Sequence, residues 1–279
     1  MQKRILTIQD YSCLGRCSLT VAIPTISSAG IEAISIPTAI LSNHTAFSSW
    51  SYLDMTSKME EIVSYWDKYN HSFDSIYTGY LSNDQIPTVI NIINKLKEDK
   101  TKIFVDPAMA DNGKLYPGFD NNHVIMMRDL ISISNIAIPN LTEACLLLDR
   151  DYNPDIDNDG IKDMLLELSK LGPSLVVISG IRRDDKIIIA SYNKNNDEYY
   201  FLEDDLLPGI YHGTGDLFSS AFISCLENDI NYKDSIKISH EYVYEAIKCT
   251  LNDNQNGVLY GVQFEKVIPE FVRNIKKNK

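Results

Sequence analysis

The residues best suited to catalysis lie in one short segment, His212-Gly213-Thr214-Gly215-Asp216. It precedes a run with apolar residues at helical spacing, which are Leu217, Phe218, Ala221, Phe222, Cys225 and Leu226. Two glycines let the backbone approach a ligand closely, and the N–H groups of a first helical turn favour negative charge. Phosphoryl transfer needs such an anion site and a group that accepts the proton of the attacking alcohol. The segment therefore predicts a phosphate site with Asp216 as its base.

A simpler interpretation of the same segment stays open on this pattern alone. In that alternative, Asp216 is only a helix N-cap and the two glycines form a tight turn. A Gly-x-Gly-Asp pattern is weak evidence by itself, so the rest of the chain must decide between the two.

The elements that must position this segment alternate between short apolar strands and amphipathic helices. The predicted strands are Arg4–Gln9, Ala33–Ile36, Ser75–Thr78, Lys102–Val105, Asn135–Ile138 and Ser174–Ser179. Helical patterns occur near residues 18–28, 55–69, 85–98, 122–132, 142–149, 160–171, 216–227, 232–251 and 264–276. The alternation predicts an α/β fold with a mostly parallel central sheet and helices on both faces. The runs Lys186–Tyr192 and Glu198–Leu202, joined by a polar turn, predict an antiparallel edge.

Composition excludes several other classes of protein. The 279-residue chain has a net charge of −12, which argues against nucleic-acid and membrane-surface partners, because both need a basic patch. No apolar run reaches 18 residues, and Gln9 and Asp10 interrupt the stretch that a secretory signal would need. Five scattered cysteines are typical of reduced thiols. We expect a single domain over residues 1–279 in the cytoplasm.

The combination of motifs is more specific than any one of them. Gly213–Phe218 resembles the anion-hole signature of ribokinase-like kinases. Further segments resemble the pyridoxal kinase branch of that family and follow its order, namely Ile8-Gln9, Ser42-Asn43-His44-Thr45, Thr78-Gly79-Tyr80, Asp106-Pro107 and Pro139-Asn140 with Glu143. The resemblance implies a three-layer αβα ribokinase-like fold. It also implies ATP-dependent phosphorylation of the 5′-hydroxymethyl group of pyridoxal, pyridoxine or pyridoxamine, with Mg²⁺, often a monovalent cation such as K⁺, and a homodimer.

The resemblance also implies roles for individual residues. Asp216 would be the catalytic base, and Gly213, Thr214 and Gly215 would bind the transferring phosphate. Asp106 and Glu143 would organise Mg²⁺ and the ATP phosphates with support from Asn140, although Asn140 and Glu143 are equally a helix capping box. Tyr116 would lie in a flexible loop, Asp111–Tyr116, that covers ATP, and Ser179 would contact ATP. Thr45 and Tyr80 would line the pocket for the substrate ring.

Asp10 is a departure from the family pattern, which commonly has serine at this position. A carboxylate there accepts hydrogen bonds from a protonated ring nitrogen or a ring hydroxyl, and Ser12 is near enough in sequence to replace the usual serine. The choice among substrates therefore stays open. One alternative is a hydroxymethylpyrimidine kinase on the same scaffold, and another is a protein that binds a B6 vitamer without catalysis.

Overall fold

The computed structural model describes residues 2–69, 71–253 and 257–279. Nine strands form one sheet in the order β11-β10-β9-β8-β5-β4-β1-β2-β3. Neighbouring strands from β9 to β2 run parallel, whereas β10 and β11 at one edge and β3 at the other are antiparallel to their neighbours. Their bounds are β1 Arg4–Ser12, β2 Glu32–Leu41, β3 Tyr52–Asp54, β4 Ser75–Thr78, β5 Lys102–Val105, β8 Ile136–Ala137, β9 Leu175–Arg183, β10 Lys186–Asn193 and β11 Glu198–Asp205. A separate hairpin joins β6 Ala110–Asp111 to β7 Lys114–Leu115.

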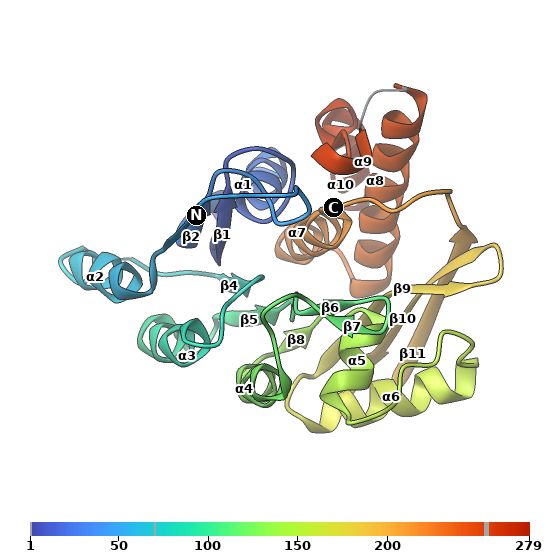
Figure 1. Cartoon of the computed structure of the whole chain (residues 1–279), viewed down its shortest axis with the longest axis horizontal. Coiled ribbons are helices and arrows are strands. Elements are labelled where there is room, and N and C mark those ends of the chain that lie inside the picture. The colour runs from blue at the N-terminus through green and yellow to red at the C-terminus, as the bar shows by residue number, and fades with distance from the viewer. Residues whose placement is uncertain (1, 70, 254–256) are drawn as a thin grey trace.

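Helices cover both faces of the sheet, so the expected three layers are confirmed (Figure 1). One face carries α2 Thr56–Trp66, α3 Gln85–Leu96, α4 Asn121–Ser132, α5 Leu141–Leu147 and α6 Asn158–Lys170. The other carries α1 Leu19–Ser28, α7 Thr214–Glu227, α8 Tyr232–Asn252 and α10 Ile268–Asn278. Two short elements, α9 Gly257–Tyr260 and the 3-10 turn Phe264–Lys266, precede α10.

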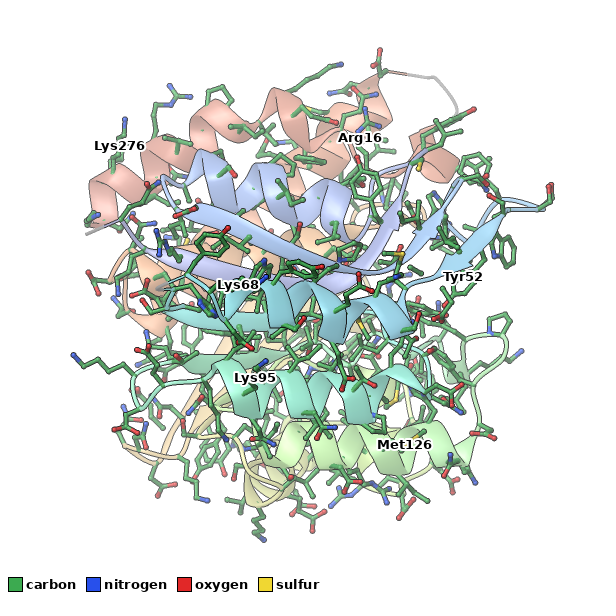
Figure 2. All side chains as sticks on the ribbon, turned by 90° about the vertical axis from the view of Figure 1, so that its left-hand side faces the viewer. Arg16, Tyr52, Lys68, Lys95, Met126 and Lys276 are labelled. Atoms are coloured by element: carbon green, nitrogen blue, oxygen red, sulfur yellow. The ribbon has the colours of Figure 1, made fainter. Side chains whose placement is uncertain are left out.

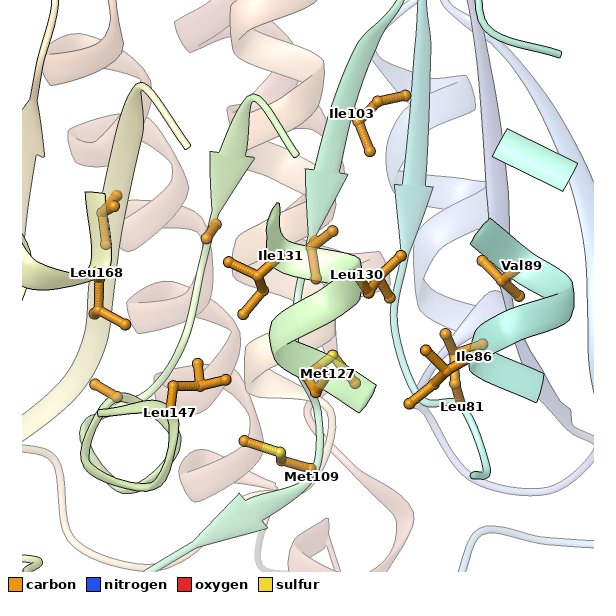
Figure 3. Packing of buried hydrophobic residues seen from close by; sticks show 14 of the residues in the cluster. Leu81, Ile86, Val89, Ile103, Met109, Met127, Leu130, Ile131, Leu147 and Leu168 are labelled. Carbon is orange, nitrogen blue, oxygen red and sulfur yellow. The ribbon is translucent and has the colours of Figure 1, made fainter. Parts of the chain in front are cut away.

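The apolar residues of the sheet and its helices form one core on each face. Figure 3 shows part of the first core, where Met127, Leu130 and Ile131 of α4 pack towards the strands. Charged residues such as Lys95 of α3 extend from the outer surfaces of the helices on this face (Figure 2), although Tyr65 of α2 and Ile125 of α4 are also exposed. In the second core, Leu217 and Phe222 of α7 are fully buried. Burying one such side chain contributes about 1.5–3 kcal/mol to the stability of the fold. The packing of α7 in this core therefore fixes the position of its N-terminus.

Most predicted elements match the structure, and the differences have physical reasons. β4 and β5 have the predicted bounds, whereas β1 runs on to Ser12 because Tyr11 and Ser12 still pair with Ile40 and Leu41 of β2. The strand β3 was not predicted, since three exposed residues give no alternating pattern. The segment predicted as a flexible loop, residues 111–116, is instead the β6–β7 hairpin, and that prediction was wrong.

The carboxyl ends of the central parallel strands carry the residues that the motifs singled out. Asp10 lies near the end of β1, Gly79 follows β4, Asp106 follows β5 and Asn140 follows β8. Because these strands are neighbours in the sheet, the four positions meet along one edge, as expected for an open α/β sheet. Among the described residues, no helix is long and apolar enough to span a membrane.

Candidate active site

The turn before α7 has a backbone that only glycine adopts without strain. Gly213 has a φ of 76° and occupies the N-cap position of α7, where no side chain caps the helix. A Cβ at Gly213 would lie 2.0 Å from the carbonyl oxygen of Arg16. Since the first N–H groups of a helix lack partners within the helix, this uncapped turn, which includes Thr214 and Gly215, can bind an anion through its backbone.

Asp216 lies in the third position of α7, so the alternative that it caps the helix is wrong. Its Oδ2 accepts a hydrogen bond of 2.8 Å from the backbone N–H of Ser18, which precedes α1. Burial, together with the charge of Asp106, raises the pKa of Asp216 to about 7, although the Ser18 N–H opposes the rise. A carboxyl group with a pKa near neutrality suits a general base.

Asp106 is a buried carboxylate at the same edge of the sheet. Only 8% of the residue is exposed, and burial raises its pKa to about 6. Its Oδ2 accepts a hydrogen bond of 2.8 Å from the hydroxyl of Ser219 on α7, and its Oδ1 accepts one of 3.2 Å from the N–H of Ala108. These bonds hold the side chain against the helix that carries Asp216.

Glu143 is held almost entirely by backbone donors. Its Oε1 accepts from the N–H of Met109 at 2.9 Å, and its Oε2 accepts from the N–H of Asn140 at 2.8 Å. Asn140 in turn accepts from the N–H of Glu143 at 3.0 Å, which completes the predicted capping box of α5. Burial and the charge of Asp106 raise the pKa of Glu143 to about 8.

The chemistry of these carboxylates fits a magnesium ion that has ligands from outside the protein. Among the residues that the structure describes, no three His, Cys, Asp or Glu side chains are grouped to hold a metal by themselves. Both oxygens of Glu143 accept N–H groups, and each oxygen of Asp106 accepts one hydrogen bond. Asp106 and Asp216 also repel each other as carboxylates, a repulsion that a cation between them would relieve. Mg²⁺ usually keeps several waters and binds through one or two carboxylates and substrate phosphates, which this arrangement accommodates.

The β6–β7 hairpin brings Tyr116 towards the acidic residues. Asn112 and Gly113 form its turn, both with positive φ, and the N–H of Gly113 donates to the hydroxyl of Thr142 at 2.9 Å. Burial raises the pKa of Tyr116, and the charge of Glu143 is the largest of several acidic contributions to the same rise. The hairpin therefore places Tyr116 beside the carboxylates.

The side chains expected to contact the substrate ring lie on three separate segments. Tyr80 follows β4 and stacks on Phe119 with a ring separation of 5.4 Å. Burial raises its pKa, and so does the charge of Asp10, which places Tyr80 within electrostatic reach of that carboxylate. Thr45 is exposed in the turn after β2, beside the buried His44. The structure thus places Tyr80 near Asp10, whereas Thr45 is exposed to solvent.

Asp10 and Ser179 lie within β1 and β9, because both strands run on past their predicted ends at Gln9 and Ser179. Asp10 is 5% exposed, and its two oxygens accept hydrogen bonds from the hydroxyls of Ser12 and Ser18, at 3.0 and 2.5 Å. Ser179 lies within β9, where its N–H donates to the carbonyl of Pro139 at 2.9 Å and the residue bridges to Asn140. That bridge places Ser179 beside the start of α5.

Comparisons with known proteins give the family of this chain. A family model described as phosphomethylpyrimidine kinase matches residues 20–259. The chain belongs to the phosphomethylpyrimidine kinase family. A pyridoxal kinase of Dictyostelium discoideum is 30% identical over 245 residues, which cover 80% of this chain and 78% of the relative.

Solved structures extend the likeness over nearly the whole chain. One is a Bacteroides thetaiotaomicron protein named after phosphomethylpyrimidine kinase and crystallised with pyridoxal. It is 35% identical to this family member, with a TM-score of 0.93 and coverage of 97% of this chain and 96% of the other. The pyridoxal kinase of Lactobacillus plantarum shares the fold, with a TM-score of 0.90, 24% identity and 98% of each chain covered.

Ser18 was not singled out in the sequence, although it contacts two of the acidic side chains in this member of the family. It donates its N–H to Asp216 and its hydroxyl to Asp10. A serine just before a helical pattern is an ordinary N-cap signal, so its type gave no reason to assign it to the site. The Asn112-Gly113 pair was a usable signal, because Asn-Gly is the preferred sequence of a tight hairpin turn.

The buried carboxylates predict an unusual dependence of stability on pH. The folded-state pKa values of Asp216 and Glu143 lie near 7 and 8, above the usual range of their unfolded forms, so folding favours their neutral states. Their contribution to stability is present at low pH and is lost as the pH rises through 7 and 8. We expect the free energy of unfolding to fall by roughly 1–4 kcal/mol between pH 7 and 9.

Thermal unfolding of the nucleotide-free protein at pH 7, 8 and 9 measures this effect. The window lies above the usual pKa of unfolded histidine, so the buried histidines contribute little to the change. Glu143→Gln should flatten the profile because it removes one of the two titrations. A melting temperature that is constant or rises over this range, in the wild type, would contradict the assignment.

Proposed function

We propose that this chain transfers the γ-phosphoryl group of ATP to the 5′-hydroxymethyl group of pyridoxal, pyridoxine or pyridoxamine, giving pyridoxal 5′-phosphate or its analogue. The observation that carries the proposal is the position of Asp216, a half-buried carboxylate in the first turn of α7 and beside the uncapped glycine turn. A relative with 30% identity is named pyridoxal kinase, and a 35% identical structure was crystallised with pyridoxal. Both support a B6 vitamer as the acceptor.

In this mechanism each group of the chain has one task. Asp216 accepts the proton of the 5′-hydroxyl of the vitamer. The hydroxyl oxygen of the vitamer bonds to the γ-phosphorus of ATP, and the bond between that phosphorus and the β–γ bridging oxygen breaks to release ADP. The N–H groups around Thr214 and Gly215 stabilise the charge on the transferring phosphoryl. The β6–β7 hairpin with Tyr116 excludes water, which would otherwise hydrolyse ATP.

We propose Mg²⁺ as the accompanying cation, held by Asp106 and by ATP, with Glu143 acting through water. Bound there, it would neutralise the charge of the phosphates. In the same scheme Asn140 and Ser179 lie on the ATP side, and Asp10, Ser12, Thr45 and Tyr80 on the vitamer side. A requirement for K⁺ rests on the resemblance alone.

A second candidate function is phosphorylation of hydroxymethylpyrimidine. The match to the phosphomethylpyrimidine kinase model favours it, because that family is named for a pyrimidine substrate. Both substrates carry a hydroxymethyl group on a flat ring, so the same base and anion site serve either. The discriminating contacts lie around Asp10 and Tyr80, which face the ring in both schemes.

Release of ADP from MgATP, measured at equal concentrations of the four acceptors, separates these candidates. We expect at least one B6 vitamer to give a kcat/KM about 10-fold or more above that of hydroxymethylpyrimidine, a difference of roughly 1.4 kcal/mol in transition-state binding. The reverse order would favour the pyrimidine kinase. Tight vitamer binding without any ADP release would favour a non-catalytic binding protein.

We also propose that residues 1–279 act as one kinase domain, in the cytoplasm and as a homodimer. The edge strand β3 supports an association surface, because Tyr52 and Leu53 on it are 46% and 58% exposed and Trp50 beside it is 43% exposed. An edge strand also offers backbone groups that a second chain can pair with.

A further inference from the structure

We propose that Ser18, together with Asp10, is a positioning residue that holds the base Asp216 in its reactive orientation. The inference rests on the proposed function and extends it to a residue outside the recognised motifs. It assigns to Asp10 a structural link to the base in addition to any contact with the substrate ring.

The first observation is that Ser18 does not use its hydroxyl as an N-cap. It occupies the N-cap position of α1, where serine normally accepts a hydrogen bond from the first turn, yet no such bond is present. The hydroxyl donates instead to Asp10 Oδ1 at 2.5 Å, while the backbone N–H of the same residue donates to Asp216 Oδ2 at 2.8 Å. One residue therefore connects the buried Asp10 and the half-buried Asp216.

The backbone of Ser18 is the second observation. Its φ of 49° and ψ of −130° lie in a region that L-amino acids rarely adopt and glycine adopts readily. Strained residues of this kind persist where the surroundings hold them, and they cluster at functional sites. Here the neighbouring Thr20 hydroxyl donates to the carbonyl of Cys17 at 2.7 Å and so secures the turn from one side. The bond to Asp10 secures it from the other.

Asp10 is itself placed by an irregularity in the sheet. The β1–β2 register shifts between Gln9 and Tyr11, so Asp10 has no partner in the regular ladder. Such irregularities re-aim side chains and are common beside active sites. Its second oxygen accepts from the Ser12 hydroxyl at 3.0 Å. The chain of contacts thus runs from Ser12 through Asp10 and Ser18 to Asp216.

This chain of contacts has a consequence for the reaction. The donated N–H fixes Oδ2 of Asp216, which leaves Oδ1 to accept the proton of the substrate hydroxyl. Losing that restraint lets the carboxylate rotate, and a misplacement of about 1 Å can cost up to about 10²-fold in rate. The effect should fall mainly on kcat, because Ser18 itself has no assigned contact with the vitamer or ATP.

Two substitutions at Ser18, both of which remove the hydroxyl, test whether the backbone conformation of this residue is what positions Asp216. We expect Ser18→Ala to lower kcat about 10-fold or more, with the KM for pyridoxal within about 3-fold of wild type. Ser18→Gly lacks the hydroxyl too, but glycine adopts this backbone without strain and keeps the N–H in place, so it should recover most of the lost rate. Ser28→Ala, at the other end of α1, is the matched control, since that hydroxyl bonds only to Thr25 in its own helix.

Asp10→Asn supplies a second readout, the pH dependence of kcat, which should not change if Ser18 and Asp10 have only a structural role. The titratable groups that interact electrostatically with Asp216 are Asp10 on β1, Cys17 before α1, Tyr77 on β4, Asp106 after β5 and Tyr116 after β7. Removing the charge of Asp10 should shift the acidic limb of the kcat profile to lower pH, by a few tenths of a unit or more.

The outcomes separate this inference from the proposed function. It is supported if Ser18→Ala loses kcat, Ser18→Gly recovers it and Asp10→Asn shifts the limb. It is overturned if Ser18→Ala and Ser18→Gly are equally active, or if either variant, still folded by circular dichroism, raises the KM for pyridoxal and leaves kcat unchanged. A wild-type protein that phosphorylates no vitamer would instead refute the proposed function.

Discussion

Asp216→Asn should lower kcat for pyridoxal phosphorylation by about 10²–10⁴-fold, the usual contribution of a positioned general base. The amide oxygen of asparagine can still accept the N–H of Ser18, so the local geometry is kept while the proton acceptor is lost. The KM values should change little, because the side chain acts on the transition state. Steady-state ADP release with saturating pyridoxal and MgATP measures the loss.

The same substitution should make the protein more stable above pH 7. It removes a half-buried carboxylate whose pKa is raised to about 7 by burial and by Asp106, and such a charge costs up to roughly 3 kcal/mol by pH 9. A variant that is stable but inactive would indicate that Asp216 has a catalytic role and not a structural one. Loss of activity accompanied by loss of stability would indicate a structural role instead.

Asp234→Asn is the matched control. Asp234 occupies the third position of α8, as Asp216 does in α7, but it contacts only the N-terminal cap of its own helix. We expect its kcat to stay within about 2-fold of wild type, as for most surface substitutions. If Asp216→Asn keeps more than a third of the wild-type rate, Asp216 is not the base.

Gly213→Ala is expected to have the second largest effect. A Cβ there would lie 2.0 Å from the carbonyl oxygen of Arg16, and Arg16 cannot retreat freely because its N–H donates to the carbonyl of Tyr260 at 3.0 Å. The turn must therefore shift, and its N–H groups move away from the phosphate. We expect kcat/KM for ATP to fall about 10²-fold or more, comparable to the loss of an oxyanion-hole donor.

Gly30→Ala separates this steric effect from the cost of the backbone conformation. Gly30 has a φ of 83°, close to the 76° of Gly213, but a Cβ there would meet no atom within 4 Å. Its substitution should cost about 1–2 kcal/mol of stability through the positive φ alone and leave kcat/KM unchanged. Equal activity of the two variants would show that the turn does not bind phosphate.

The fold could be predicted because the pattern of apolar residues repeats locally. β4, β5 and the helices lie within a few residues of their predicted bounds, since each carries its own period in the sequence. The acidic residues could be placed at one edge of the sheet, because parallel strands share their carboxyl ends. The hairpin at residues 110–115 was missed, although Asn112-Gly113 is the sequence of a tight turn.

The connections within the site could not be predicted in this way. The bond between Ser18 and Asp216 joins residues 198 positions apart, and it depends on how α1 packs against α7. The steric need for Gly213 likewise comes from Arg16, far away in the sequence. Contacts of this kind follow from tertiary packing, which the local sequence pattern does not encode.

The central claim is that this chain moves a phosphoryl group from ATP to the 5′-hydroxymethyl group of a B6 vitamer with Asp216 as the base. Phosphorus NMR of the wild-type protein with pyridoxal and MgATP tests it most directly. We predict a pyridoxal 5′-phosphate signal that grows in step with ADP, and that grows at least about 100-fold more slowly with Asp216→Asn. Formation of ADP and inorganic phosphate without any phosphorylated vitamer would contradict the claim.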